Sequence, residues 1–209
     1  MIMPKIERIS VAPLAFPYDA LYPAFSASTL VAHFEKIMRA HLDALTILKA
    51  SYRELAAMTI CELLTARSLP RRDADEIRWH AGAVYAHELY FSSLSVPLGG
   101  YCQPGALLAE AISQSVGSFS ELVYRLREAA TAMRGVGFLY LIRDRRGRLT
   151  IRCLRDYDVP QFSCERSLFC IDLWEHAYFV DHGARPDLAV DAFLSVLNWS
   201  AAEEKYKRS

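Results

Sequence analysis

Hydrophobic residues recur at helical spacing through most of the first half of the chain. This pattern predicts helices at about residues 30–50, 52–66 and 73–94. Ser28 or Thr29 can cap the first of them, and a proline closes the second. Within the first helix the spacing places His33, Ile37 and His41 on one face. The N-terminal half is therefore predicted to be helical.

The pattern changes in the second half, where helical periods are joined by short apolar runs typical of strands. Residues 92–105 hold the densest group of glycines and prolines, so we expect a domain boundary there, between domains 1–94 and 95–209. The expected elements are helices 106–116 and 120–134, strands 138–143, 148–154 and 167–172, and helices at about 173–180 and 186–197, which finish the chain. Gly147 lies in a charged turn between the first two strands, as a hairpin requires. A helical N-terminal domain followed by a C-terminal α/β domain is the expected architecture.

The composition is that of an ordinary globular protein, with 209 residues of which 53% are hydrophobic and 23% charged. The 24 basic residues balance 24 acidic ones, so the overall charge favours neither nucleic acid nor a membrane surface as a partner. The five cysteines form no C-x-x-C pair and their number is odd, which favours free thiols in a reducing compartment. The sequence has neither a signal-peptide pattern nor an apolar run of roughly 20 residues, so we expect a cytoplasmic protein.

The most specific string is D-L-W-E-H-A-Y at residues 172–178. Further motifs lie in order along the chain: F-P-Y-D-A-L-Y-P near the start, T-L-x-x-H at 29–33, A-G-x-x-x-x-H at 81–87, V-G-S-F at 116–119, G-x-G at 135–137, R-P-D at 185–187 and N-W at 198–199. Over nearly its whole length the chain resembles the iron/manganese superoxide dismutases. The resemblance implies an α+β fold, with an N-terminal antiparallel helical hairpin domain and a C-terminal α/β domain containing a three-stranded antiparallel sheet.

The resemblance also implies a metal site with one iron or manganese ion per chain. The family's four protein ligands fall on His33, His87, Asp172 and His176. Neutral imidazoles and a carboxylate suit a borderline first-row ion, whereas a thiolate-preferring metal would require cysteine. A lone histidine on a half-apolar helix face is more often structural than metal-binding, but four coincident matches favour a metal site that joins the two domains.

Three neighbouring residues receive roles from the same resemblance. Trp174 would wall the pocket, and Glu175 would orient His176 of the partner subunit, which implies a homodimer. Arg185 would lie near the funnel and attract a small anionic substrate, superoxide. A solvated arginine beside a loop proline explains Arg185 equally well.

The pocket around the expected ligands departs from the family pattern. The two positions that can supply the family's glutamine hold Ala83 and Tyr157, and the position of its funnel tyrosine holds His41. Further departures, in apolar or aromatic positions of the pocket and the dimer contact, are Ile37, Ala86, Phe138, Tyr140 and Phe179. One interpretation is that Tyr157 and His41 have exchanged the roles of the family's pair, with a phenol from the C-terminal domain and an imidazole from the first helix holding a metal-bound solvent molecule between them. The other is that Tyr157 is a packing residue and His41 is partly exposed.

Three functions remain open from the sequence. The first is a divergent superoxide dismutase in which His41, Tyr157 and Arg185 serve the reaction. The second is a different redox enzyme on the same fold, acting on dioxygen or peroxide, because the residues that tune potential and deliver protons have changed. The third is a non-catalytic, metal-stabilised dimer. The sequence does not choose between iron and manganese.

Overall fold

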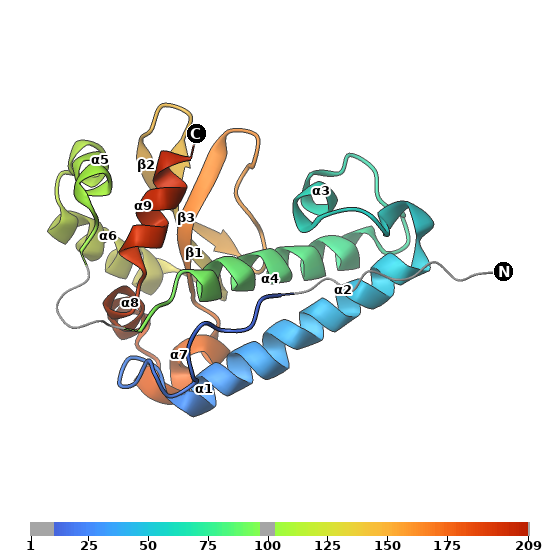
Figure 1. The fold of residues 1–209 in the computed structure, drawn as a ribbon, viewed down its shortest axis with the longest axis horizontal. Helices are drawn as coiled ribbons and strands as arrows, with labels where there is room; N and C mark the ends of the chain where they lie inside the picture. Colours follow the sequence, from blue (N-terminus) through green and yellow to red (C-terminus); the bar gives the residue numbers. More distant parts are fainter. Residues whose placement is uncertain (1–10, 97–102, 209) are drawn as a thin grey trace.

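The computed structural model describes residues 11–96 and 103–208 (Figure 1). The chain first forms one long helical rod, made of α1 (Ala27–Val31), a π-helical segment (Ala32–Met38) and α2 (Arg39–Ser51). Its cap is Ser26, whose side chain accepts from the backbone N–H of Thr29, so the expected caps Ser28 and Thr29 lie inside the helix. The prediction of a helix at about 30–50 is confirmed, with its start three residues earlier.

The predicted helix at 52–66 is wrong as one continuous element. Tyr52 is extended, with φ −133°, and is followed by a short 3-10 turn at Arg53–Leu55. Helix α3 (Ile60–Thr65) begins separately, at a capping box in which Thr59 and Glu62 exchange side-chain and backbone hydrogen bonds. This local cap competes with continuation of the preceding helix, and the apolar spacing alone did not reveal it.

Helix α4 (Ala74–Ser92) follows Asp73, as the sequence predicts. It runs antiparallel to α2, and the two form the helical hairpin in the lower part of Figure 1. A small apolar core lies between this hairpin and α3; its buried residues are Leu45, Leu55, Leu63, Leu69, Ile77, Ala81 and Val84. The hairpin of the N-terminal region is thus confirmed.

The C-terminal region begins with the predicted helices, α5 (Ala106–Val116) and α6 (Phe119–Ala132). The strands are β1 (Gly137–Asp144), β2 (Leu149–Arg155) and β3 (Glu165–Asp172), in the order β2-β1-β3 with both pairings antiparallel. Gly147, at φ +82°, occupies the β1–β2 turn. The three-stranded antiparallel sheet is confirmed.

The chain ends with α7 (Glu175–His182), α8 (Pro186–Ser195) and α9 (Trp199–Lys207). The expectation that the helix near 186–197 finishes the chain is wrong, because α9 comes after it. Asn198 caps α9 through a hydrogen bond from the Ala201 N–H, 2.9 Å long. A cap residue ahead of W-S-A-A-E-E-K-Y-K was the signal available in the sequence.

Helices from both halves of the chain cover the sheet. α4 and α9 pack against β3, and α5 and α6 pack against β2 (Figure 1). The first six residues of the central strand β1 are all buried, as expected for a strand covered on both faces. The main core surrounds this strand and α8; it includes Phe138, Leu139, Leu141, Phe169, Phe193 and Trp199. The division into domains 1–94 and 95–209 stays a prediction, since part of the joining segment lies outside the described residues.

Two general features hold for the described residues. The cysteines among them, Cys61, Cys153, Cys164 and Cys170, are free thiols, while Cys102 lies outside the described part. None of the helices described has both the length and the apolar character needed to cross a membrane.

Gly82 of α4 allows a close approach between the two halves of the chain. A Cβ at this position would collide with the backbone carbonyl oxygen of Tyr157. We therefore predict that Gly82→Ala destabilises the protein by about 1–3 kcal/mol, because the clash with backbone outweighs the gain in helix propensity. Gly105→Ala is the matched control, since the atoms nearest to a Cβ there belong to the carboxylate end of the Glu203 side chain, which can move. Urea unfolding measures both, and equal stability of the two variants would contradict the argument.

Candidate metal centre

Four elements bring their polar side chains to one point. His33 comes from the π-helical segment, His87 from α4, Asp172 from the end of β3 and His176 from the first turn of α7. One ligand atom from each lies within 4.8 Å of the others, and we call this group the His/Asp cluster. The structure thus brings together all four residues expected to bind metal.

The imidazoles converge on one carboxylate oxygen. Asp172 Oδ2 lies 3.0 Å from His33 Nε2, 3.4 Å from His176 Nε2 and 3.7 Å from His87 Nε2. His33, His87 and Asp172 are fully buried as side chains, and the His176 side chain is 20% exposed. Nevertheless, none of these four atoms has a hydrogen-bond partner of acceptable geometry among the described residues. Buried polar atoms left in this way are costly, and a cation held between them would satisfy all four.

Hydrogen bonds to the other atoms of two side chains fix which atoms face inward. His87 Nδ1 is 2.7 Å from the Ala83 carbonyl oxygen, so it donates there and leaves the Nε2 lone pair free. Asp172 Oδ1 accepts from the backbone N–H of Trp174 at 2.8 Å, which leaves Oδ2 for the cluster. These contacts orient a ligand set before any ion binds.

The electrostatics give the protonation state that a cation requires. Burial, followed by the charge of His33, lowers the pKa of His87 to about 3, and burial is also the main cause that lowers the pKa of His33. For Asp172, burial raises the pKa, but the imidazoles of His176 and His33 outweigh it and hold the pKa below its ordinary value. At neutral pH His33 and His87 are therefore uncharged and Asp172 is ionised.

His41 and Tyr157 lie together beside the cluster, as a swapped pair would require. Their ring centroids are 4.7 Å apart, and each ring lies 5.9 Å from that of His87. Burial, then the charges of His80 and His176, lowers the pKa of His41 to about 4, so its ring is neutral at pH 7. Burial and the Asp172 charge raise the pKa of Tyr157, so its phenol stays protonated at this pH. No hydrogen bond joins His41 to Tyr157 among the described residues.

Two residues of this pocket were missed by the sequence analysis. His80 Nδ1 lies 3.0 Å from His41 Nδ1, and His80 Nε2 lies 3.5 Å from a carboxylate oxygen of the exposed Glu76. Trp79 places its ring edge against Tyr157, with centroids 4.8 Å apart. His80 precedes His87 by seven residues, two turns along the same helix face, and this spacing was the signal available in the sequence.

Trp174, the residue expected to wall the pocket, lies against two of its rings. Its ring stacks on Tyr157 at 4.8 Å and 13°, and on His176 at 5.8 Å and 28°. Phe138 closes another side, 5.7 Å from the His87 ring. The cluster is therefore enclosed largely by aromatic rings, which limit the access of water.

Arg185 and Glu175 lie in more exposed surroundings. Arg185 makes a two-pronged ion pair with Asp187, at 2.9 and 2.6 Å, and its side chain is 60% exposed. It is therefore a neutralised surface cation rather than a free one. Glu175 is exposed in the first turn of α7 and forms no ion pair among the described residues.

The fold and the cluster define the class: an α+β protein with a buried three-histidine, one-aspartate group suited to a single metal ion. Residues 104–205 match the family model for the C-terminal domain of iron/manganese superoxide dismutases. The chain is 30% identical to a superoxide dismutase (Mn) of Thermus thermophilus, over 94% of this chain and 96% of that protein. It is 32% identical to a superoxide dismutase (Mn) of Listeria monocytogenes, over 92% and 95%. A superoxide dismutase (Fe) of Legionella pneumophila is 31% identical, over 93% and 96%. The chain belongs to the iron/manganese superoxide dismutase family.

The depressed pKa of His41 gives a pH-dependent stability to the metal-free protein. Because the folded-state pKa of about 4 lies below the ordinary 6.5, the unfolded chain binds more protons between these values. The free energy of unfolding should therefore fall as the pH drops from 6.5 towards 4. Replacing His41 by Phe should make this fall shallower, whereas Tyr157→Phe, beside the same ring, should retain it. Denaturant midpoints across this pH range measure the slopes, and identical slopes in wild type and His41→Phe would contradict the assignment.

Proposed function

We propose that this chain is a superoxide dismutase that holds one iron or manganese ion between His33, His87, Asp172 and His176. The observation that supports it most is the set of four buried, mutually facing ligand atoms that find no hydrogen-bond partner in the described part of the chain. The relatives named as manganese and iron superoxide dismutases support the same reaction. The donor set contains no thiolate, because the neighbouring Cys170 donates its S–H to the Ala86 carbonyl, 3.3 Å away.

Bound in the cluster, the ion would supply the reversible one-electron exchange that dismutation requires. One superoxide gives up an electron and becomes dioxygen. A second superoxide takes an electron and two protons and becomes hydrogen peroxide. The chain must therefore hold the ligands in place, keep bulk water away and deliver protons.

We assign proton delivery to His41. Its Nδ1 is engaged with His80, which leaves Nε2 as its free nitrogen, and its ring touches both Tyr157 and His87. A neutral imidazole can donate at one nitrogen and be reprotonated through the other. His80 and the 67% exposed side chain of Glu76 provide that second route, from the pocket to solvent. Tyr157 packs between Trp79 and Trp174 and restricts the space in front of the cluster.

The dimer expected from the family resemblance stays a prediction, in which Glu175 orients His176 of the partner subunit. Glu175 is exposed and has no ion-pair partner among the described residues. On the same helix, Phe179 is 50% exposed and Val180 73% exposed, so α7 presents apolar surface that a second subunit could cover. A cytoplasmic location also stays a prediction, supported by the free thiols.

Metal content is the first test. We expect the purified protein to contain about one iron or manganese ion per chain and His87→Ala to lose it, because one of four ligands is removed. Loss of the ion should lower the thermal midpoint, since the ion binds only the folded chain. His182→Ala is the matched control: His182 contacts the Ala24 carbonyl and takes no part in the cluster. Elemental analysis of the three proteins decides, and a metal-free wild type or a fully loaded His87→Ala would refute the site.

Turnover in His41→Phe is the second test. We expect superoxide removal to slow by about 10²-fold or more, the usual contribution of a positioned proton donor, while metal content stays unchanged. Ile47→Phe, at an exposed position of the same helix, serves as the control. Unchanged turnover in His41→Phe would remove the proton-delivery role. A wild type that binds metal without removing superoxide would favour the alternative redox chemistry, with dioxygen or peroxide as substrate.

A further inference from the structure

A surface pocket lies at the end of the sheet opposite to the His/Asp cluster. Its volume is about 210 Å³, and it is lined by the end of β1 and by the segment before and at the start of β3: Arg143, Asp144, Arg145, Phe162, Ser163, Cys164, Glu165 and Arg166. Asp172, at the other end of β3, is six residues beyond Arg166, or about 20 Å along an extended strand. The pocket is therefore separate from the proposed metal site.

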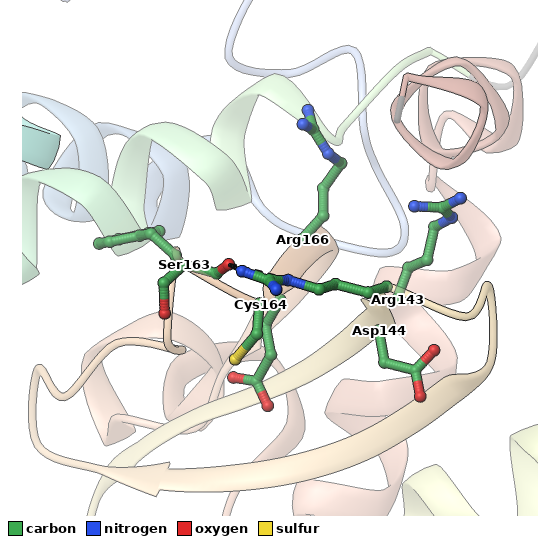
Figure 2. Close-up of a pocket in the computed structure, with 8 residues that line it drawn as sticks. Arg143, Asp144, Ser163, Cys164 and Arg166 are labelled. Atoms are coloured by element: carbon green, nitrogen blue, oxygen red, sulfur yellow. Dashed lines mark hydrogen bonds between the residues drawn. The ribbon is translucent and has the colours of Figure 1, made fainter.

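Two arginines of the pocket oppose each other directly. Arg143 of β1 and Arg166 of β3 are register partners in the antiparallel pair, and Figure 2 shows both side chains projecting to the same side of the strands. Like charges at directly opposed positions destabilise a sheet. Neither arginine forms an ion pair within the described residues. A counter-charge from outside the chain would relieve this repulsion.

The carboxylates of the pocket are already engaged. Asp144 pairs with the Arg148 side chain at 3.0 Å and also accepts from the backbone N–H groups of Arg146 and Arg148. Glu165 pairs with Arg152 and accepts from a backbone N–H. Both negative charges are thus directed to arginines outside the pocket, and no ion pair among the described residues compensates Arg143 or Arg166.

The positions of two of these arginines are fixed in advance. Arg145 donates through Nε to the Ser163 carbonyl at 3.1 Å. Arg143 lies over the ring of Tyr206, 5.2 Å from its centroid, and its buried Nε has no hydrogen-bond partner in the described part of the chain. A buried guanidinium nitrogen without an acceptor is an unmet hydrogen-bonding capacity. It points to an acceptor that the described residues do not provide.

We propose that this pocket binds a phosphate group, either free inorganic phosphate or the phosphate of a small monoester. Guanidinium groups match phosphate oxygens in geometry and charge, and arginine is the preferred residue where such recognition is required. The volume lies below the usual range for sites of larger organic ligands, which favours a compact anion over a nucleotide. This site is independent of the proposed dismutase function.

Titration calorimetry of the full chain with inorganic phosphate tests the proposal, at constant ionic strength maintained with chloride. We expect saturable binding of one phosphate per chain, weakened about tenfold or more in Arg143→Gln and in Arg166→Gln, because each removes a charge-assisted contact. Arg146→Gln is the matched control: it is an exposed arginine of the same turn that does not line the pocket, and it should bind as wild type does. Thermal midpoints without phosphate report whether each variant is folded.

A second titration, with glycerol phosphate, distinguishes the two sources of the group. Tighter binding of the monoester identifies a phosphorylated small molecule, and tighter binding of inorganic phosphate identifies the free ion; both support the site. Absence of saturation up to about 50 mM, displacement by chloride at equal ionic strength, or equal affinity in Arg166→Gln and Arg146→Gln would each overturn it. Metal content and superoxide removal should be the same in all variants, so the outcome does not depend on the dismutase assignment.

Discussion

The structure depends on a constraint at its centre: Asp172 Oδ2 and three imidazole nitrogens face one another, buried and without hydrogen bonds to any described residue. Such a group is unfavourable by itself, because each atom has lost water and gained no partner. A bound cation would remove this free-energy cost, because it would interact with the carboxylate and with the three imidazole lone pairs together. Elements from both ends of the chain must meet at this point, so the helical hairpin, the end of β3 and α7 have to be placed relative to one another before the cluster exists.

The regular elements could be predicted because their signals are local. Period and caps identified α4 to α8 and the three strands, and the motif resemblance identified the four residues of the cluster. The two errors in the predicted helices also have local causes, namely side-chain caps. The break at Tyr52 depends on a capping box that begins a new helix, and α9 depends on Asn198 after a short interruption. In both cases a side-chain cap starts a new helix, and the spacing of apolar residues alone does not show where that helix begins.

The surroundings of the cluster were less predictable, because they arise from contacts between distant segments. The pairing of His41 with Tyr157 was one of two alternatives, and only the structure brings the rings into contact. The involvement of His80 and Trp79 requires knowing which face of α4 meets the loop that carries Tyr157. That meeting rests on Gly82, whose missing side chain lets the Tyr157 backbone lie against the helix. The residue types along the chain, taken one position at a time, do not reveal which face of α4 meets this loop.

The π-helical segment at Ala32–Met38 has a consequence for how this site can change in evolution. A π-helical turn accommodates an extra residue in a helix while the later turns keep their phase with neighbouring elements. Each residue of an α-helix turns the chain by about 100°, so deletion of one residue here would rotate all later residues of the rod by that amount relative to His33. The imidazole of His41 would then leave the side of the helix on which it meets His80 and Tyr157. Length, and not only residue identity, is therefore under constraint along this rod, between His33 and the residues of the pocket that follow it.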